Sequence, residues 1–260
     1  AIHTLFNLIT PALFLPFVKP FARLVARIIR SDAATKPHLS ALKMTSRLSP
    51  VIACDQALLE VSFMRDSDLE LLTDVRKVLT GEADTKIEDH IAHRENVLDN
   101  VQREITEFLG KIMVKRVPTS VSERARRLLR ISDELESVSD EASTVLKVTR
   151  RLRKGGQEFS EASLRVMLEI HDRTTDYAKE VSALVKSPRP PIDLSRMQSV
   201  STELHDLVRT RRQGQLNRIG PDDPSSPIRV LAELDILNAY ERIRAYYLNI
   251  AETLAGGKSN

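Results

Sequence analysis

Two pairs of acidic residues have a spacing that could bind a cation. Glu95 and Asp99 lie four residues apart in one predicted helix, and Glu136 and Asp140 lie four apart in the next. This spacing places both carboxylates of a pair on one helix face. Two such pairs on neighbouring helices could converge into an all-oxygen site for a divalent metal or iron.

A simpler interpretation is that these acids are exposed and ion-paired with nearby bases, namely Arg94, Arg103 or Lys147. Like charges four residues apart repel, so each acidic pair lowers helix stability unless a cation offsets it. The chain contains no GxSxG, no phosphate-binding P-loop and no GxGxxG motif, and no other catalytic residue set is evident. We therefore expect a protein that is not an enzyme.

A basic cluster follows the second acidic pair, with Arg150, Arg151, Arg153 and Lys154 at the predicted end of a helix. Cations at a helix C-terminus offset the helix dipole, and this is the simpler explanation. The alternative is that the cluster contacts an anion or lipid headgroups.

Six helical segments are predicted to position these residues. Ser49-Pro50 and Ser226-Pro227 each combine an N-cap residue with a proline at the first helical position, and glycines and prolines separate the other segments. The predicted ranges are 50–79, 82–115, 120–154, 160–186, 194–216 and 227–255. With no tryptophan, 4% aromatic and 29% charged residues, the composition also favours an all-α fold.

The Gly155-Gly156 break divides the body into two similar halves, 46–154 and 157–256. At an offset of 105 residues, a stripe in the third segment matches one in the sixth. Apolar or bulky residues occupy both members of six pairs: Leu129/Leu234, Ile131/Ile236, Leu135/Tyr240, Val138/Ile243, Ala142/Tyr247 and Val145/Ile250. Glu136 matches Glu241 in the same register. The halves are therefore predicted to be two tandem three-helix bundles.

Residues 1–30 differ from the rest because they are largely apolar from Leu5 to Val18 and then basic. A signal peptide is disfavoured, since its basic residues should precede the apolar region. Arg23, Arg27 and Arg30 recur at helical spacing, which is typical of an interfacial helix contacting lipid or another anion. The preferred interpretation is the last transmembrane helix of a larger membrane domain, in keeping with a chain that begins without methionine, with 31–45 as juxtamembrane linker.

Charge is also distributed unevenly. Residues 1–47 carry seven Lys or Arg and one acid, a net charge of +6, whereas the remainder carries 32 bases and 35 acids, a net charge of −3. The body is mildly acidic, so the overall pI near 9.0 does not indicate nucleic-acid binding. The positive-inside rule places the chain after residue 30 in the cytoplasm, and the single cysteine, Cys54, fits a reducing compartment.

Several segments resemble one family. LAELDILNAYERIRAYYLNIAETLAGGK (231–258) resembles the closing helix of PhoU-like domains, and LLRISDELESVSDEAS (128–143) resembles the equivalent helix of the first half. RENVLDNVQREITEFL (94–109) resembles their ExxxD-bearing helix. HTLFNLITPALFLPF (3–17) resembles the end of the membrane domain in bacterial sodium/phosphate cotransporters with a PhoU-like tail.

The resemblance implies the C-terminal part of a sodium-dependent phosphate transporter: a last membrane helix in the inner membrane and a cytosolic regulatory domain. Its expected partners are the membrane, the transporter's own membrane domain and phosphate-signalling proteins. The family's metal-binding motifs correspond to Glu95/Asp99 and Glu136/Asp140. The second half departs from the pattern, with Ala245 where an aspartate is expected. A membrane-anchored phosphate-signalling adaptor outside any transporter is the alternative.

Overall fold

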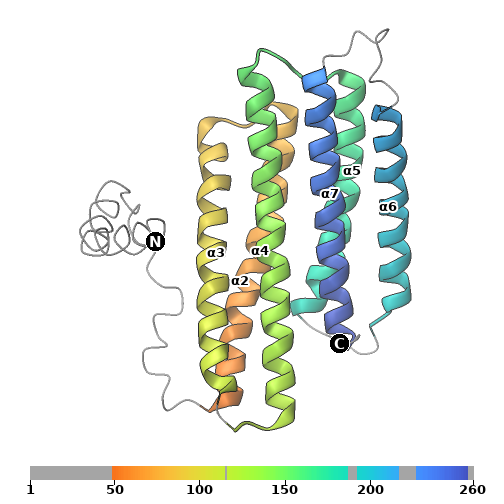
Figure 1. The fold of residues 1–260 in the computed structure, drawn as a ribbon. Helices are drawn as coiled ribbons and strands as arrows, with labels where there is room; N and C mark the ends of the chain where they lie inside the picture. Colours follow the sequence, from red (N-terminus) through yellow and green to blue (C-terminus); the bar gives the residue numbers. More distant parts are fainter. Residues whose placement is uncertain (1–48, 115, 187–191, 217–226, 257–260) are drawn as a thin grey trace, which may run out of the picture. The chain divides into compact units, whose positions relative to one another are not determined.

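The computed structural model describes residues 49–114, 116–186, 192–216 and 227–256 (Figure 1). Within these ranges the regular structure consists of six α-helices, without strands, so the predicted all-α class is confirmed. The helices are α2 (Pro50–Thr80), α3 (Thr85–Met113), α4 (Thr119–Lys154), α5 (Glu161–Lys186), α6 (Leu194–Leu216) and α7 (Pro227–Leu254).

The predicted membrane segment 1–30 and linker 31–45 lie outside the described residues, and so do Arg23, Arg27 and Arg30. Across the helices that the structure does describe, none combines the length and apolarity needed to cross a bilayer. The membrane-associated helix therefore stays a prediction.

The largest difference from the predicted helix starts is at α3. The second predicted helix begins three residues later because the Asp84 carboxylate caps it, accepting a hydrogen bond from the Ile87 backbone N–H at 2.9 Å. α4 begins at Thr119, directly after Pro118 and one residue before its predicted start, and Pro118 makes no side-chain capping bond.

The six helices belong to one compact unit built from two sets of three. In Figure 1, α3 lies at one side of the bundle and α6 at the other, with α2, α4, α5 and α7 between them. The interface of α4 with α7 is the most extensive, and α2 also packs against α5. The two halves therefore meet through these four central helices, which we call the seam.

The duplicated stripe forms the centre of this seam. In α4, the side chains of Ile131, Leu135, Val138, Ala142 and Val145 are buried, and in α7 so are those of Ile236, Tyr240, Ile243, Tyr247 and Ile250. Only the first pair, Leu129 and Leu234, is half-buried. Burying such a stripe is the main source of helix-packing stability, so both members of the matched stripes contribute to the core.

Polar bonds tie the halves together at the edges of the apolar stripe. Arg242 donates two hydrogen bonds to Glu141, at 2.5 and 2.7 Å, and the Asn249 amide donates to Glu134 at 3.1 Å. All four residues lie on α4 or α7. These directional contacts fix the register in which the two central helices pack.

Candidate functional site

The four predicted carboxylates lie on adjacent helices, with Glu95 and Asp99 on α3 and Glu136 and Asp140 on α4. Asp140 is exposed and the other three are half-buried. Their charges interact across the two helices, because Asp140 acts on Glu95 and Asp99 acts on both Glu136 and Asp140. The structure therefore brings the predicted residues together as one acidic cluster.

Three of these groups titrate above their ordinary range. Burial raises the pKa of Glu95, and the charges of Asp140 and Asp99 add to the effect. Burial also raises the pKa of Glu136, again with Asp140 and Asp99 contributing. The pKa of Asp140 is raised chiefly by burial, opposed by Lys147. Mutual repulsion of this kind is relieved when a cation binds.

Bases surround the cluster, as the simpler interpretation expected. Arg103 pairs with Asp99 at 2.6 Å, and the Lys147 charge lowers the pKa of both Glu95 and Asp140. Arg94 instead pairs with Glu70, at 2.8 Å. In the part of the chain that the structure describes, no three His, Cys, Asp or Glu side chains are grouped closely enough to hold a metal ion. The oxygen donors suit a hard cation, whereas their side-chain arrangement is not a formed coordination site, and the metal stays a prediction.

A further acid, Asp68 on α2, was missed by reasoning from sequence. Its side chain is fully buried, and neither carboxylate oxygen has a hydrogen-bond partner among the described residues. Burial raises the pKa of Asp68 well above its ordinary range, and the charge of Glu136 adds to this. The fold therefore favours the protonated form of Asp68, because an unpaired buried carboxylate is strongly disfavoured.

Asp68 connects the acidic cluster with the seam. Its charge raises the pKa of Tyr247, second to burial itself, and the Ser182 hydroxyl on α5 is another polar neighbour of that tyrosine. A signal for Asp68 was present in the sequence. It falls in the same helical stripe as Met64, Leu71 and Leu72, all of which are buried, so an acid at this position had to be buried too.

The equivalent position in the second half has the opposite environment. Glu241, which matches Glu136 at the offset of 105, is bonded to Arg244 at 2.6 Å and His205 at 2.8 Å. Burial tends to raise the pKa of Glu241, but the bonds from Arg244 and His205 outweigh burial and lower it. On α6, Glu203 has Ser199 rather than an acid four residues before it, and both side chains are exposed. The second half thus stabilises its glutamate with bonds from Arg244 and His205.

A buried histidine also lies in the seam. His171 on α5 exchanges a hydrogen bond with the Tyr240 hydroxyl at 2.9 Å, and Thr175 lies 3.3 Å from its other ring nitrogen. Burial lowers the pKa of His171 to about 4, so the imidazole is neutral at neutral pH. The ring pair is edge-to-face, with centroids 5.6 Å apart. His171 is therefore a structural residue of the core.

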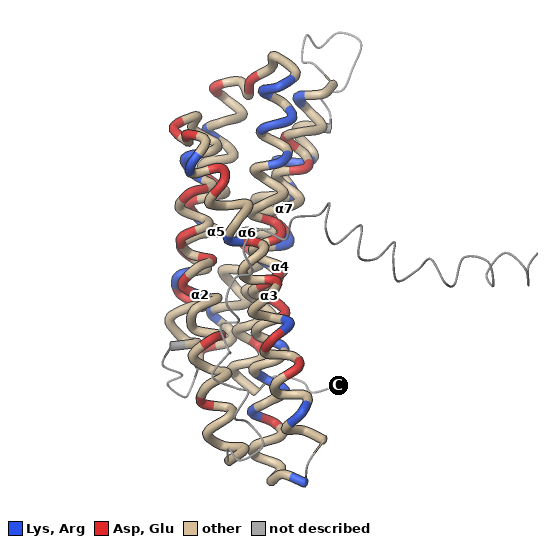
Figure 2. Tube along the Cα trace, turned by 90° about the vertical axis from the view of Figure 1, so that its left-hand side faces the viewer, with Lys and Arg blue, Asp and Glu red and all other residues tan. Residues whose placement is uncertain are grey.

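The basic cluster at the end of α4 is largely used in contacts between helices. Arg150 pairs with Glu88 at 2.5 Å, and Arg153 donates to the Val78 carbonyl at 2.6 Å. Arg151 reaches α7, where it pairs with Asp235 at 3.1 Å. Figure 2 shows the general pattern, with Lys and Arg interspersed among Asp and Glu along the helices. Most of this cluster thus ties helices together.

No family model matches this chain, and no curated protein matches it. Solved structures do match. PhoU from Pseudomonas aeruginosa is similar over 79% of this chain and 97% of that one, with 20% identity and a TM-score of 0.69. The phosphate transport system regulatory protein PhoU from Streptococcus pneumoniae covers 79% of this chain and 95% of its own, with 12% identity and a TM-score of 0.65. The chain therefore has a PhoU-like fold.

Proposed function

We propose that this chain regulates phosphate transport by contact rather than by catalysis. The observation that carries the proposal is that the fold matches nearly the whole length of two PhoU proteins, one of which is named as a phosphate transport system regulatory protein. A bundle of this kind has two packed halves, and a partner that binds one arrangement of them better than another shifts the equilibrium between arrangements. Phosphate-signalling proteins are the expected class of soluble partner.

The more specific proposal is that the bundle is the cytosolic tail of a sodium-dependent phosphate transporter of the inner membrane. Supporting it are the apolar, then basic, residues 1–30 and the change from a net charge of +6 before residue 48 to −3 after it. In this arrangement the transporter's own membrane domain is the partner. The transport residues then belong to that domain, because one terminal helix cannot form a coupled ion pathway.

A second candidate is a phosphate-signalling adaptor that residues 1–30 anchor to the membrane surface. The helical spacing of Arg23, Arg27 and Arg30 favours it, because such a stripe suits anionic headgroups. Upstream coding sequence separates the two candidates. Several hydrophobic spans before Ala1 support the transporter, whereas a start codon directly before Ala1 supports the adaptor.

We further propose that the acidic cluster takes up a divalent metal or iron. Glu95, Asp99, Glu136 and Asp140 would hold it, with some side-chain rearrangement. The raised pKa of three of these groups supports a cation there, because burial and mutual repulsion disfavour their charged forms and the surrounding bases offset this only in part. When bound, the metal would supply positive charge between α3 and α4.

Deletion of residues 46–260 from the intact parent transporter tests the regulatory role. Phosphate uptake is measured in cells grown with abundant and with scarce phosphate, and membrane insertion of the truncated protein is verified. We expect uptake to lose its dependence on phosphate supply. Unchanged uptake under both conditions would refute the regulatory proposal.

A further inference from the structure

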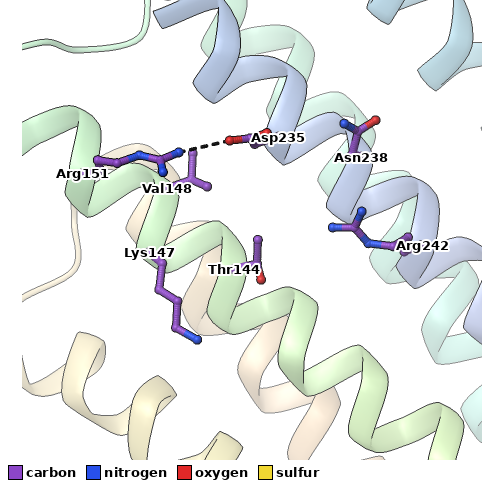
Figure 3. A pocket seen from close by; sticks show the side chains of 7 residues that line it. All are labelled: Thr144, Lys147, Val148, Arg151, Asp235, Asn238 and Arg242. Atoms are coloured by element: carbon purple, nitrogen blue, oxygen red, sulfur yellow. Dashed lines mark hydrogen bonds and ion pairs between the residues drawn. The ribbon is translucent and has the colours of Figure 1, made fainter. Parts of the chain in front are cut away.

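A polar groove lies between α4 and α7. It has a volume of about 330 Å³, and the buried side chain of Val148 contributes to its lining. Each half of the bundle supplies three of its six polar side chains, Thr144, Lys147 and Arg151 from α4 and Asp235, Asn238 and Arg242 from α7 (Figure 3). The groove therefore exists only when the halves are packed together.

The lining is rich in positive charge and hydrogen-bond donors. It contains two guanidinium groups and one ammonium against a single carboxylate. Arg242 bonds Glu141 through Nε and Nη2, and in the described residues no bond uses its Nη1. Lys147 is exposed and has no ion pair within 4 Å among the described side chains, and its charge also acts on Glu95 and Asp140 of the acidic cluster. Figure 3 shows the Arg242 side chain extending from α7 toward α4, while Arg151 reaches across in the opposite direction.

Donors of this kind suit a small tetrahedral oxyanion. Guanidinium groups bind oxyanions through paired N–H bonds, and an ammonium adds a compact charge. The Thr144 hydroxyl and the Asn238 amide can donate to the remaining oxygens. We propose that this groove binds inorganic phosphate. The choice of phosphate among oxyanions rests partly on the proposed function, whereas the anion site itself rests on the lining residues.

Asp235 supplies an independent reason to choose phosphate. A carboxylate can only accept hydrogen bonds, and it would repel a fully deprotonated anion such as sulfate. Monohydrogen phosphate carries one hydroxyl, which can donate to Asp235 while the other oxygens accept from Arg151 and Arg242. Asp235 and Arg151 are already 3.1 Å apart, so the acceptor and a donor lie side by side in the groove. The acid thus makes the groove selective for phosphate over sulfate.

Phosphate bound here would bridge the two halves. Because α4 and α7 each supply half of the polar lining, the ligand stabilises the arrangement in which these helices are packed. A site that forms only at the seam gives the domain a direct response to phosphate, without a separate sensor. The groove thus extends the proposed regulatory role by making the packing of the two halves depend on phosphate.

The test measures phosphate binding to the purified 260-residue chain by equilibrium dialysis. Lys147→Gln with Arg151→Gln removes two exposed cations of the groove, and Arg165→Gln with Lys179→Gln removes a matched pair on α5. We expect saturable binding by the native chain, at least about tenfold weaker in the groove variant and unchanged in the control. Equal binding by all three, or none by the native chain, would overturn the proposal.

Two further arms identify the anion. Sulfate should compete poorly with phosphate for the native chain, and Asp235→Asn should let sulfate compete about as well as phosphate; equal competition in the native chain would overturn the assigned selectivity. Vesicles of phosphatidylcholine with and without phosphatidic acid test a lipid source. Groove-dependent binding to phosphatidic acid without binding of free phosphate would overturn the assignment of inorganic phosphate.

The outcomes also separate this proposal from the regulatory one. Phosphate binding that requires the groove, combined with uptake that does not respond to deletion of 46–260, would retain the site and remove the regulatory function. If uptake responds to phosphate supply but the groove variant binds phosphate as the native chain does, the regulatory function is retained and the proposed site is removed.

Discussion

Arg242 on α7 and Glu141 on α4 form a two-point pair across the seam, with Nε–Oε1 and Nη2–Oε2 distances of 2.5 and 2.7 Å. The Glu141 side chain is 12% exposed and that of Arg242 is 47% exposed. The hydrogen bonds to Glu141 raise the pKa of Arg242. The glutamate depends more on the contact, because it has less access to water when the arginine is removed.

Replacing Arg242 with glutamine should therefore lower the free energy of unfolding by about 1–2 kcal/mol, since a largely buried carboxylate loses its charged partner while water replaces only part of the bond. Urea unfolding at neutral pH measures the loss. The control is Arg165→Gln, whose pair with Glu161 is well exposed on both sides, and about 0.5 kcal/mol or less is expected there. Equal losses in the two variants would show that the seam pair has no special role.

Asp68→Asn should change how stability depends on pH. The pKa of Asp68 is raised in the folded chain, so between its unfolded value and its folded value the folded state holds one more proton. Native stability should then fall with rising pH by about 1.4 kcal/mol per unit relative to the asparagine variant. The variant should be the more stable chain at pH 8, with the difference shrinking toward pH 4. A constant difference across this range would mean that Asp68 is not protonated in the fold.

His171→Gln should change the pH dependence of stability below neutral pH. With its pKa lowered to about 4, His171 stays neutral in the folded chain while the unfolded chain takes up a proton below about pH 6.5. The contribution of the neutral His171 to the free energy of unfolding is fully present above about pH 6.5. It decreases by about 1.4 kcal/mol per pH unit as the pH falls to about 4. Urea unfolding of the native and variant chains from pH 7 to 4.5 measures this effect. The free energy of unfolding should decrease less steeply with falling pH in the variant than in the native chain.

The imidazole can also be followed directly by NMR. His171 should show no titration between pH 7 and 5, and the exposed His93 serves as an internal comparison. A His171 midpoint near that of His93 would contradict the assigned burial.

Asp140→Asn should weaken metal retention by the acidic cluster by about tenfold or more, if the cluster takes up metal as proposed. It should also lower the pKa of Glu136, since the charge of Asp140 is one of the causes of its elevation. Metal analysis of the purified chain and carboxylate NMR titration measure the two effects. Glu203→Gln, on α6, is the matched control. Equal metal contents in native, Asp140→Asn and control chains would remove the cluster as a metal site.

Replacing Arg23, Arg27 and Arg30 together with glutamine should reduce binding to anionic vesicles, with each arginine contributing about 1 kcal/mol. Flotation with vesicles containing phosphatidylglycerol measures the change. Replacing Arg209, Arg211 and Arg212, which are exposed on α6, alters net charge equally and should leave vesicle binding intact. If both triple variants bind alike, the N-terminal arginines are not lipid contacts.

The helices and their duplication could be predicted because the chain marks them locally. Ser49-Pro50 starts α2 where predicted, and the stripe from Ile131 to Val145 is buried together with its match in α7. The start of α3 could not be placed, because the Asp84 cap competes with other polar residues in the same turn. Sequence spacing also predicted the proximity of Glu95 to Asp140, since two adjacent helices present those faces.

The functional features that were missed depend on contacts between distant segments. The pKa of Asp68 on α2 responds to Glu136 on α4, Asp68 in turn acts on Tyr247 on α7, and the polar lining of the groove comes equally from α4 and α7. No local pattern specifies which of many arginines face one another across the seam. The N-terminal prediction lies outside the described residues and stays a prediction.

The unequal sizes of the matched residues in the seam affect how copies of this chain can associate. Leu135 and Ala142 on α4 match Tyr240 and Tyr247 on α7, and all four side chains are buried. Two first halves from different molecules would leave cavities where the tyrosines belong, and two second halves would overfill the same space. The seam therefore favours pairing of unlike halves, which opposes the like-with-like exchange that a duplicated sequence would otherwise permit.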